Sequence, residues 1–141
     1  LGPRLRRALV RAFKRDARDV NGTVLRAVVG EVHADNPWLR VLVSRHHAIA
    51  LDFPYFQPAL HGSEQGVGLV MYYEPIGAGR RSLAAGEVRR LLYTMWRRAY
   101  RVASPLGNAN FRRMLRALHG RRRIGSRLPL PHTRRERNAI S

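Results

Sequence analysis

An apolar stripe in the second half of the chain limits its fold more than any other feature. The stripe consists of Val88, Leu91, Leu92, Met95, Ala99 and Val102. Residues three or four positions apart share one face of a helix, so this spacing predicts a helix from Ser82 to about Ala103. The apolar face is expected to pack on the core of a domain, while arginines occupy the far face. A shorter helix is predicted from 111 to 119, with a stop at Gly120.

In the segment before this helix, apolar residues follow helical spacing at first and then the alternation that is typical of a strand. Five apolar residues follow helical spacing: Val24, Leu25, Val28, Val29 and Val32. They predict a helix from about Thr23 to Asp35, which Pro37 ends because the residue before a proline avoids the α region. Residues 38–44 (WLRVLVS) alternate and predict a strand. Residues 48–52 are expected to pair with that strand through a turn at His46-His47.

Prolines and glycines divide the rest of the chain. Pro54 and Pro58 exclude a regular central strand and favour an edge strand or an extended loop. A turn is predicted at 61–63 (HGS), a strand at 67–73 (VGLVMYY) and a loop at 75–79. Beyond Gly120 the chain is rich in arginine, proline and glycine without periodicity, which predicts an extended tail.

Two structures fit the N-terminal segment. Its apolar residues are Leu5, Ala8, Leu9, Ala12 and Phe13. Their periodicity favours a helix with arginines on the opposite side. The alternative is a strand from Leu9 to Phe13 that is apolar inside and basic outside.

Composition narrows the class of protein. With 141 residues, of which 45% are hydrophobic, the chain is expected to form one domain with a closed core. The absence of cysteine excludes disulfides, thiolate zinc sites, iron–sulfur clusters and redox dithiols. No apolar run approaches the roughly 20 residues that span a bilayer, so no membrane insertion is expected. The start at Leu1 fits either removal of an arginine-rich organelle presequence or a trimmed N-terminus.

Positive charge is concentrated towards the two ends. The formal net charge is +18, and all 27 basic residues except Lys14 are arginine. Residues 1–18 carry +6, residues 19–79 carry −3, residues 80–110 carry +6 and residues 111–141 carry +9. GC-rich coding would explain the excess of arginine over lysine but not this clustering. Guanidinium groups bind phosphate through paired hydrogen bonds, so a polyanion such as nucleic acid is the expected partner.

Motifs for catalysis and for metal binding are incomplete. His46 and His47 would point to opposite faces of a strand and have no further ligands nearby in sequence, so no metal site is expected. Residues 77–82 (GAGRRS) lack the lysine of a P-loop and the third glycine of a dinucleotide motif. The nine acids are scattered, without a carboxylate pair or nucleophile–base spacing. We therefore expect no enzymatic activity, no cofactor and no small-molecule substrate.

The predicted RNA-binding residues are arginines near both ends and at the start of the long helix. They are Arg4, Arg6, Arg7, Arg80, Arg81, Arg112, Arg113, Arg116, Arg121, Arg122, Arg123, Arg127, Arg134, Arg135 and Arg137. Phosphate contacts fix position rather than sequence, so docking guided by RNA shape is expected. The tail arginines would repel one another, and phosphates are expected to order them. The arginines from Arg89 to Arg101 fit either a solvated helix face or further RNA contacts.

The order of these features resembles a thioredoxin-like domain that certain mitochondrial ribosomal proteins share with a small accessory subunit of respiratory complex I. The matching features are a basic segment ending in Arg15-Asp16, Gly22 before a helix, Asn36-Pro37 before a strand, an extended stretch at 54–62 and Ser82 at the start of a long helix. Residues 130–133 (LPHT) are similar to the C-terminal extension of the large-subunit ribosomal member. The resemblance covers about residues 8–103 and this tail fragment.

The resemblance implies a small α/β fold. Its core would be a thioredoxin-like mixed sheet of about four strands with two main helices, followed by the short helix and the extended basic tail. It implies that Leu9 to Phe13 is the first strand, contrary to the periodicity. Residues 1–103 would form the α/β domain, including a basic N-terminal segment at 1–18, and residues 104–141 would form the short helix and tail.

Charge and resemblance together predict a structural protein of the large subunit of the mitochondrial ribosome, located in the matrix. Its partners would be ribosomal RNA and neighbouring ribosomal proteins. The alternative is a non-catalytic accessory subunit of complex I or of another mitochondrial membrane complex, with arginines facing acidic protein or anionic lipid. A stand-alone RNA-binding factor is the third hypothesis.

Overall fold

The computed structural model describes residues 2–58, 68–132 and 137–139. The elements, in chain order, are α1 (Gly2–Asn21), β1 (Ala27–His33), α2 (Pro37–His46), β2 (Ile49–Ala50), β3 (Tyr55–Phe56), β4 (Gly68–Pro75), β5 (Leu83–Ala84), α3 (Ala85–Thr94), a π-helical turn (Met95–Ala99), a 3₁₀ turn (Pro105–Gly107), α4 (Ala109–Leu118) and β6 (Arg123–Ile124). The predicted turn at 61–63 lies outside the described residues.

The main sheet is built around β4. This strand pairs antiparallel with β1 on one side and with the short strands β2 and β3 on the other. Gly30 of β1 lies opposite Tyr72, where a Cβ atom would come within 2.5 Å of the Tyr72 Oη. The predicted α/β class with about four strands is confirmed. The mixed sheet that the resemblance implies is not found in the described residues, where every pairing is antiparallel.

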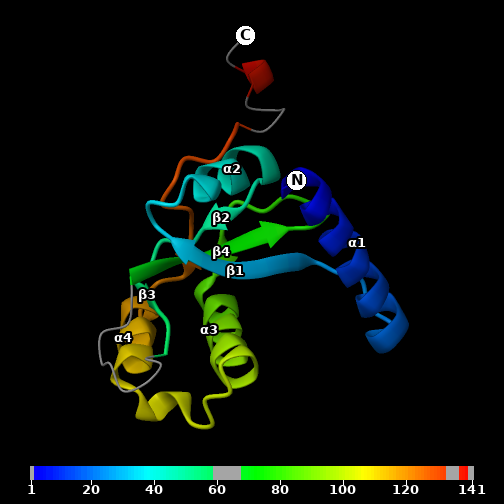
Figure 1. Ribbon diagram of the computed structural model, residues 1–141. Helices are drawn as coiled ribbons and strands as arrows, with labels where there is room; N and C mark the ends of the chain where they lie inside the picture. Colours follow the sequence, from blue (N-terminus) through cyan, green and yellow to red (C-terminus); the bar gives the residue numbers. More distant parts are fainter. Residues whose placement is uncertain (1, 59–67, 133–136, 140–141) are drawn as a thin grey trace.

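Helices cover both faces of this sheet (Figure 1). α3 and α4 lie on one face and form the larger core with it, centred on Trp96, Phe111 and Ile124, which are fully buried. α2 covers the opposite face, where Leu39 and Val43 pack with residues from β2, β4 and the tail. Because both faces are covered, the strands need no polar alternation in sequence.

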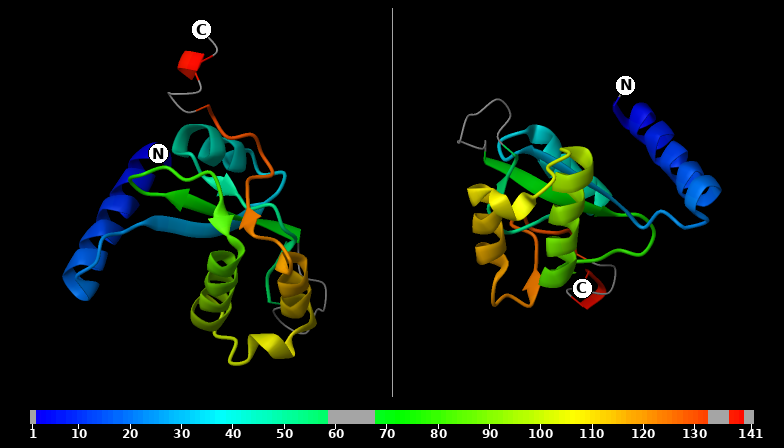
Figure 2. Two further views of the ribbon diagram at one scale, coloured as in Figure 1. Left: turned by 180° about the vertical axis from the view of Figure 1, so that it is seen from behind. Right: turned by 90° about the horizontal axis from the view of Figure 1, so that it is seen from below.

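α1 confirms the helical periodicity of the N-terminal segment, and the strand from Leu9 to Phe13 that the resemblance implies is wrong. Figure 2 shows this helix at the side of the molecule away from α4. Its apolar residues Leu5, Leu9 and Phe13 remain 56%, 46% and 42% exposed, so the body of the domain covers only part of this face.

Two predicted elements have the opposite type in the structure. The helix predicted from Thr23 to Asp35 is the strand β1, and the strand predicted at 38–44 is the helix α2. Asn36 caps α2, because its side chain accepts a hydrogen bond from Trp38 N at 2.9 Å, and Pro37 occupies the first helical position. As a consequence, residues 49–50 pair with β4 rather than with residues 38–44.

The long helix predicted from Ser82 to Ala103 is shorter than expected. Residues 83–84 form β5, α3 begins at Ala85, and the helix widens into a π-helical turn that ends at Ala99. This turn places the Trp96 side chain in the core and brings Tyr100 to the sheet, where its hydroxyl donates a hydrogen bond to Glu31. The helix at 111–119 is confirmed as α4, and Gly120 follows with φ +78°, as its role as a stop requires.

The C-terminal segment up to residue 130 is part of the domain. β6 pairs with β5, and Asp52 N donates to Gly125 O while Arg127 N donates to Ala50 O. Residues 125–127 therefore continue the sheet beyond β2. The predicted division after residue 103 does not separate two cores, because α4 and β6 contribute to the same core as the sheet.

Candidate nucleic-acid interface

Two of the predicted RNA-binding arginines form ion pairs with carboxylates of the same domain. Arg6 on α1 forms an ion pair with Glu74, whose side chain is buried at the end of β4. Burial lowers the pKa of the Arg6 guanidinium from its usual value. Arg80 forms a two-pronged ion pair with Glu87, with distances of 2.8 and 2.9 Å. These two guanidiniums are already paired with carboxylates and are poorly placed to bind phosphate.

The Arg80–Glu87 pair also organises the start of α3. Glu87 Oε1 accepts a hydrogen bond from Ala84 N at 3.2 Å, and the Arg80 guanidinium lies 5.7 Å from the centre of the Tyr73 ring. Hydrogen bonding to Arg80 lowers the pKa of Glu87 from 4.5 to about 2. The ionised carboxylate therefore contributes stability above pH 4.5, and this contribution disappears as the pH falls to about 2.

Replacing Glu87 with glutamine tests this contribution. Both partners are about one-third exposed, so we expect the substitution to lower the free energy of unfolding by only about 1 kcal/mol near neutral pH. Denaturant titrations over a pH series should show the difference between the two chains vanish as the pH falls through 2. A difference that persists in acid would show that the charge of Glu87 is not its source.

Five of the eight tail arginines that the structure describes, and also Arg81 before β5, donate hydrogen bonds within the protein. The contacts are Arg81 to Pro131 O, Arg112 to Leu106 O, Arg121 to Asp52 O, Arg123 to Ser82 Oγ and O, Arg127 to Phe53 O and Arg137 to His132 O. The expectation that phosphates are needed to order this segment is therefore wrong for residues 121–132, which the domain itself holds. These side chains are nonetheless exposed, and a guanidinium has five N–H donors, so each retains capacity for an acceptor.

The remaining predicted residues lie on separate surfaces. Arg4 and Arg7 are exposed on α1, and Arg116 and Arg122 are exposed on and after α4. Arg113 lies over the Phe56 ring at 5.6 Å. Arg134 and Arg135 lie outside the described residues.

The most continuous basic surface lies on α1, and the predicted RNA-binding set included only Arg4 and Arg7 of it. Helical spacing places six exposed cations of α1 on one side: Arg4, Arg7, Arg11, Lys14, Arg15 and Arg18. We call this set the basic stripe. Among the described residues, its only ion pair joins Arg18 to Asp19 at 3.8 Å, and both side chains are more than 70% exposed. The periodicity would have revealed the stripe if the strand alternative had been set aside.

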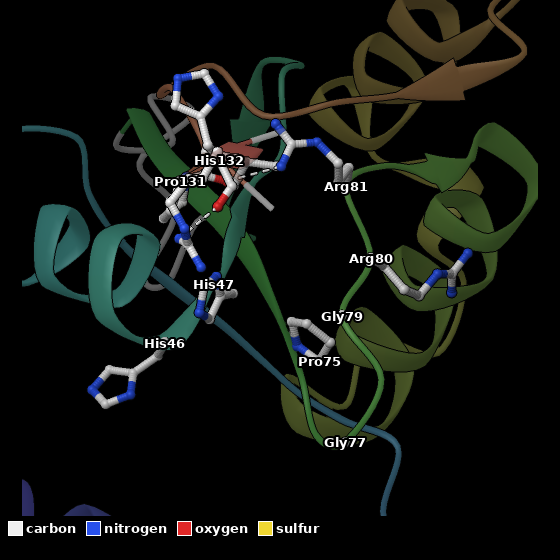
Figure 3. Close-up of a pocket in the computed structure, with 11 residues that line it drawn as sticks. His46, His47, Pro75, Gly77, Gly79, Arg80, Arg81, Pro131 and His132 are labelled. Carbon is white, nitrogen blue, oxygen red and sulfur yellow. Dashed lines mark hydrogen bonds between the residues drawn. The ribbon is translucent and has the colours of Figure 1, made fainter. Parts of the chain in front are cut away.

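A second basic feature is concave (Figure 3). A cavity of about 550 Å³ lies between the end of α2, the loop after β4 and the tail. Its described lining includes His46, His47, Arg81, His132 and Arg137, and no acidic residue. We call it the basic cavity. Arg80 borders it, but its side chain turns away towards α3.

Comparison of the chain with protein-family models, curated proteins and solved structures gives no match.

Two further features bear on chemistry in the described part of the chain. No group of three histidine, cysteine or acidic side chains lies close enough together there to hold a metal ion. No helix there is both long and apolar enough to cross a membrane.

Proposed function

We propose that this protein is a non-catalytic RNA-binding protein and that the basic stripe of α1 is its main contact with the RNA backbone. The six cations lie within an arc of about 100° and extend along about 21 Å of helix. Such a surface suits phosphates that follow one another along a strand. It carries no base-reading geometry, so binding is expected to depend on backbone and shape.

The energetics of α1 support a polyanionic partner. Arg4, Arg7 and Arg11 follow one another three and four positions apart, and Lys14 and Arg18 continue the series. Like charges at these spacings destabilise a helix by about 0.2–0.5 kcal/mol per pair. Phosphates along the stripe would remove this repulsion and release counterions.

Replacing Arg4, Arg7, Arg11 and Arg15 together with glutamine tests the proposal. Glutamine keeps the helix propensity and removes four charges. Binding of a structured RNA is expected to weaken about 100-fold at physiological salt, with a shallower dependence of affinity on salt concentration, because each lost phosphate contact lowers the slope by about 0.7–0.9.

A matched control removes the same charge elsewhere. Glutamine at Arg89, Arg90, Arg97 and Arg98, which are exposed on α3 and the π-helical turn, gives an identical change in net charge. We expect this variant to keep most of its affinity. Equal losses in the two variants would show that net charge alone drives binding, and wild-type affinity in the α1 variant would refute the proposed interface.

We propose the large subunit of the mitochondrial ribosome, in the matrix, as the assembly that contains this RNA. The element types at residues 9–13, after Gly22 and after Asn36-Pro37 differ from those that the resemblance implies, so the support is the charge distribution. Nuclease treatment of a mitochondrial lysate should release the protein from fast-sedimenting particles. Retention in a large particle after nuclease treatment would favour the alternative, an accessory subunit of a membrane complex such as complex I.

A further inference from the structure

The basic cavity differs in shape from the basic stripe. Three segments that are distant in sequence surround it: the end of α2, residues 75–81 and the tail, which contributes residues 130–132 and Arg137. Its volume of about 550 Å³ is in the range of small-ligand sites, about 300–1,000 Å³. A continuous nucleic-acid backbone suits a convex helix, whereas a cavity of this size suits a chain end or a small ligand.

Arg81 is the best-placed donor of the basic cavity. Its Nη1 donates to Pro131 O at 3.0 Å, and this bond holds the guanidinium between the loop and the tail (Figure 3). One of its five N–H groups is used in this bond, and the side chain is exposed. Arg80 does not compete for the same ligand, because Glu87 holds its guanidinium on the other side of the loop.

Two histidines at the end of α2 line the basic cavity, and of these His47 lies on its inner side, whereas the His46 ring points away from Arg81 (Figure 3). His47 is exposed and has the left-handed backbone conformation, with φ 55°. Burial, followed by the positive charges of Arg6, Arg45 and His47, lowers the pKa of His46. Arg45 and His47 therefore add positive charge at the end of α2, beside the basic cavity.

We propose that the basic cavity binds a phosphomonoester, the terminal phosphate of an RNA strand or of a free nucleotide, through Arg81 and His47. A terminal phosphate carries about −1.5 to −2 charges near neutral pH and three acceptor oxygens, more than a bridging phosphodiester offers. That the phosphate belongs to an RNA strand rests on the proposed function. The following experiment distinguishes an RNA terminus from a free nucleotide.

The test compares two RNA oligonucleotides of identical sequence, one with a 5′-phosphate and one with a 5′-hydroxyl. We expect the phosphorylated strand to bind about tenfold more tightly, because its terminal phosphate adds one set of charge-assisted hydrogen bonds. Arg81→Gln and, separately, His47→Asn should abolish this preference. Asparagine tolerates the left-handed conformation at position 47, so the second variant leaves the backbone unstrained. Arg98→Gln, on the exposed side of the π-helical turn, is the control that should retain it.

Each outcome decides one part of the proposal. Equal affinity of the wild-type protein for both strands would overturn the cavity assignment while leaving RNA binding intact. Failure of both strands to bind would overturn the proposed function. Adenosine 5′-monophosphate then tests the cavity on its own: binding that Arg81→Gln removes would keep the assignment and identify a free nucleotide as the ligand, and absence of binding would refute it.

Discussion

Replacing Trp96 with alanine is expected to lower the free energy of unfolding by about 3–5 kcal/mol. The Trp96 side chain is 0% exposed and lies at the centre of the larger core. Its ring is 5.0 Å from that of Phe111, which joins α4 to the π-helical turn. A domain of this size is stabilised by about 5–15 kcal/mol, so the variant is expected to retain little stability.

Trp38 provides the control for this experiment. It is the other of the two tryptophans and is 37% exposed at the start of α2. Trp38→Ala is expected to cost about 1 kcal/mol or less in denaturant titrations followed by circular dichroism. Similar midpoints for the two variants would contradict the central position of Trp96 in the core.

A chain that ends after Gly120 is expected to lose its cooperative unfolding transition. The truncation removes Ile124, which is fully buried, and the partly buried Leu128 and Leu130, which pack on the core beneath α2. It also removes the hydrogen bonds of residues 122–127 to Ala50, Asp52 and Ala85. Loss of one buried aliphatic side chain costs about 2–5 kcal/mol, and here a strand pairing is lost with it.

A chain that ends after His132 is the matched control. It keeps β6 and every core residue named above, so its thermal midpoint is expected to stay near that of the full chain. Calorimetry of both truncated chains measures the thermal midpoint and the cooperativity of unfolding. If the chain that ends after Gly120 unfolded as cooperatively as this control, the tail would not belong to the core.

Local patterns predicted the helices with a clear solvent face. α1 and α4 each have apolar residues on one side and arginines on the other, and periodicity located both. The predicted strand at 67–73 appears as β4 for the same local reason, a run of β-branched and aromatic residues. At the N-terminus the resemblance implied the wrong element, and the periodicity was sufficient.

The types of β1 and α2 could not be derived from periodicity. In β1, Val29 packs towards α3, while Val28 and Val32 face the other side of the sheet. Because both faces are covered, both carry valines, and the resulting spacing resembles that of an amphipathic helix. In α2, the spacing of Leu39 and Val43 fits a helix as well as the alternation predicted for a strand. The Asn36-Pro37 pair, a cap followed by proline at the first helical position, was the local indication of a helix.

The sequence predicted the type of residue in the candidate site, arginine, but not where in the structure these residues lie. Arginine clustering indicated the ends of the chain, yet Arg6 and Arg80 pair with Glu74 and Glu87, which lie far from them in sequence or across a turn. The basic cavity brings residues 46–47 next to residue 81 and the tail, and only tertiary packing creates that proximity.

Placing Ile124 in the core has a consequence for biosynthesis. Until that residue has left the translating ribosome, a nascent chain cannot complete the core between α3, α4 and the sheet, even though the other buried residues of this core have already emerged. Exposed apolar surface of this kind promotes aggregation, and chaperones recognise it. Folding of this domain is therefore expected to be completed only after Ile124 has left the ribosome.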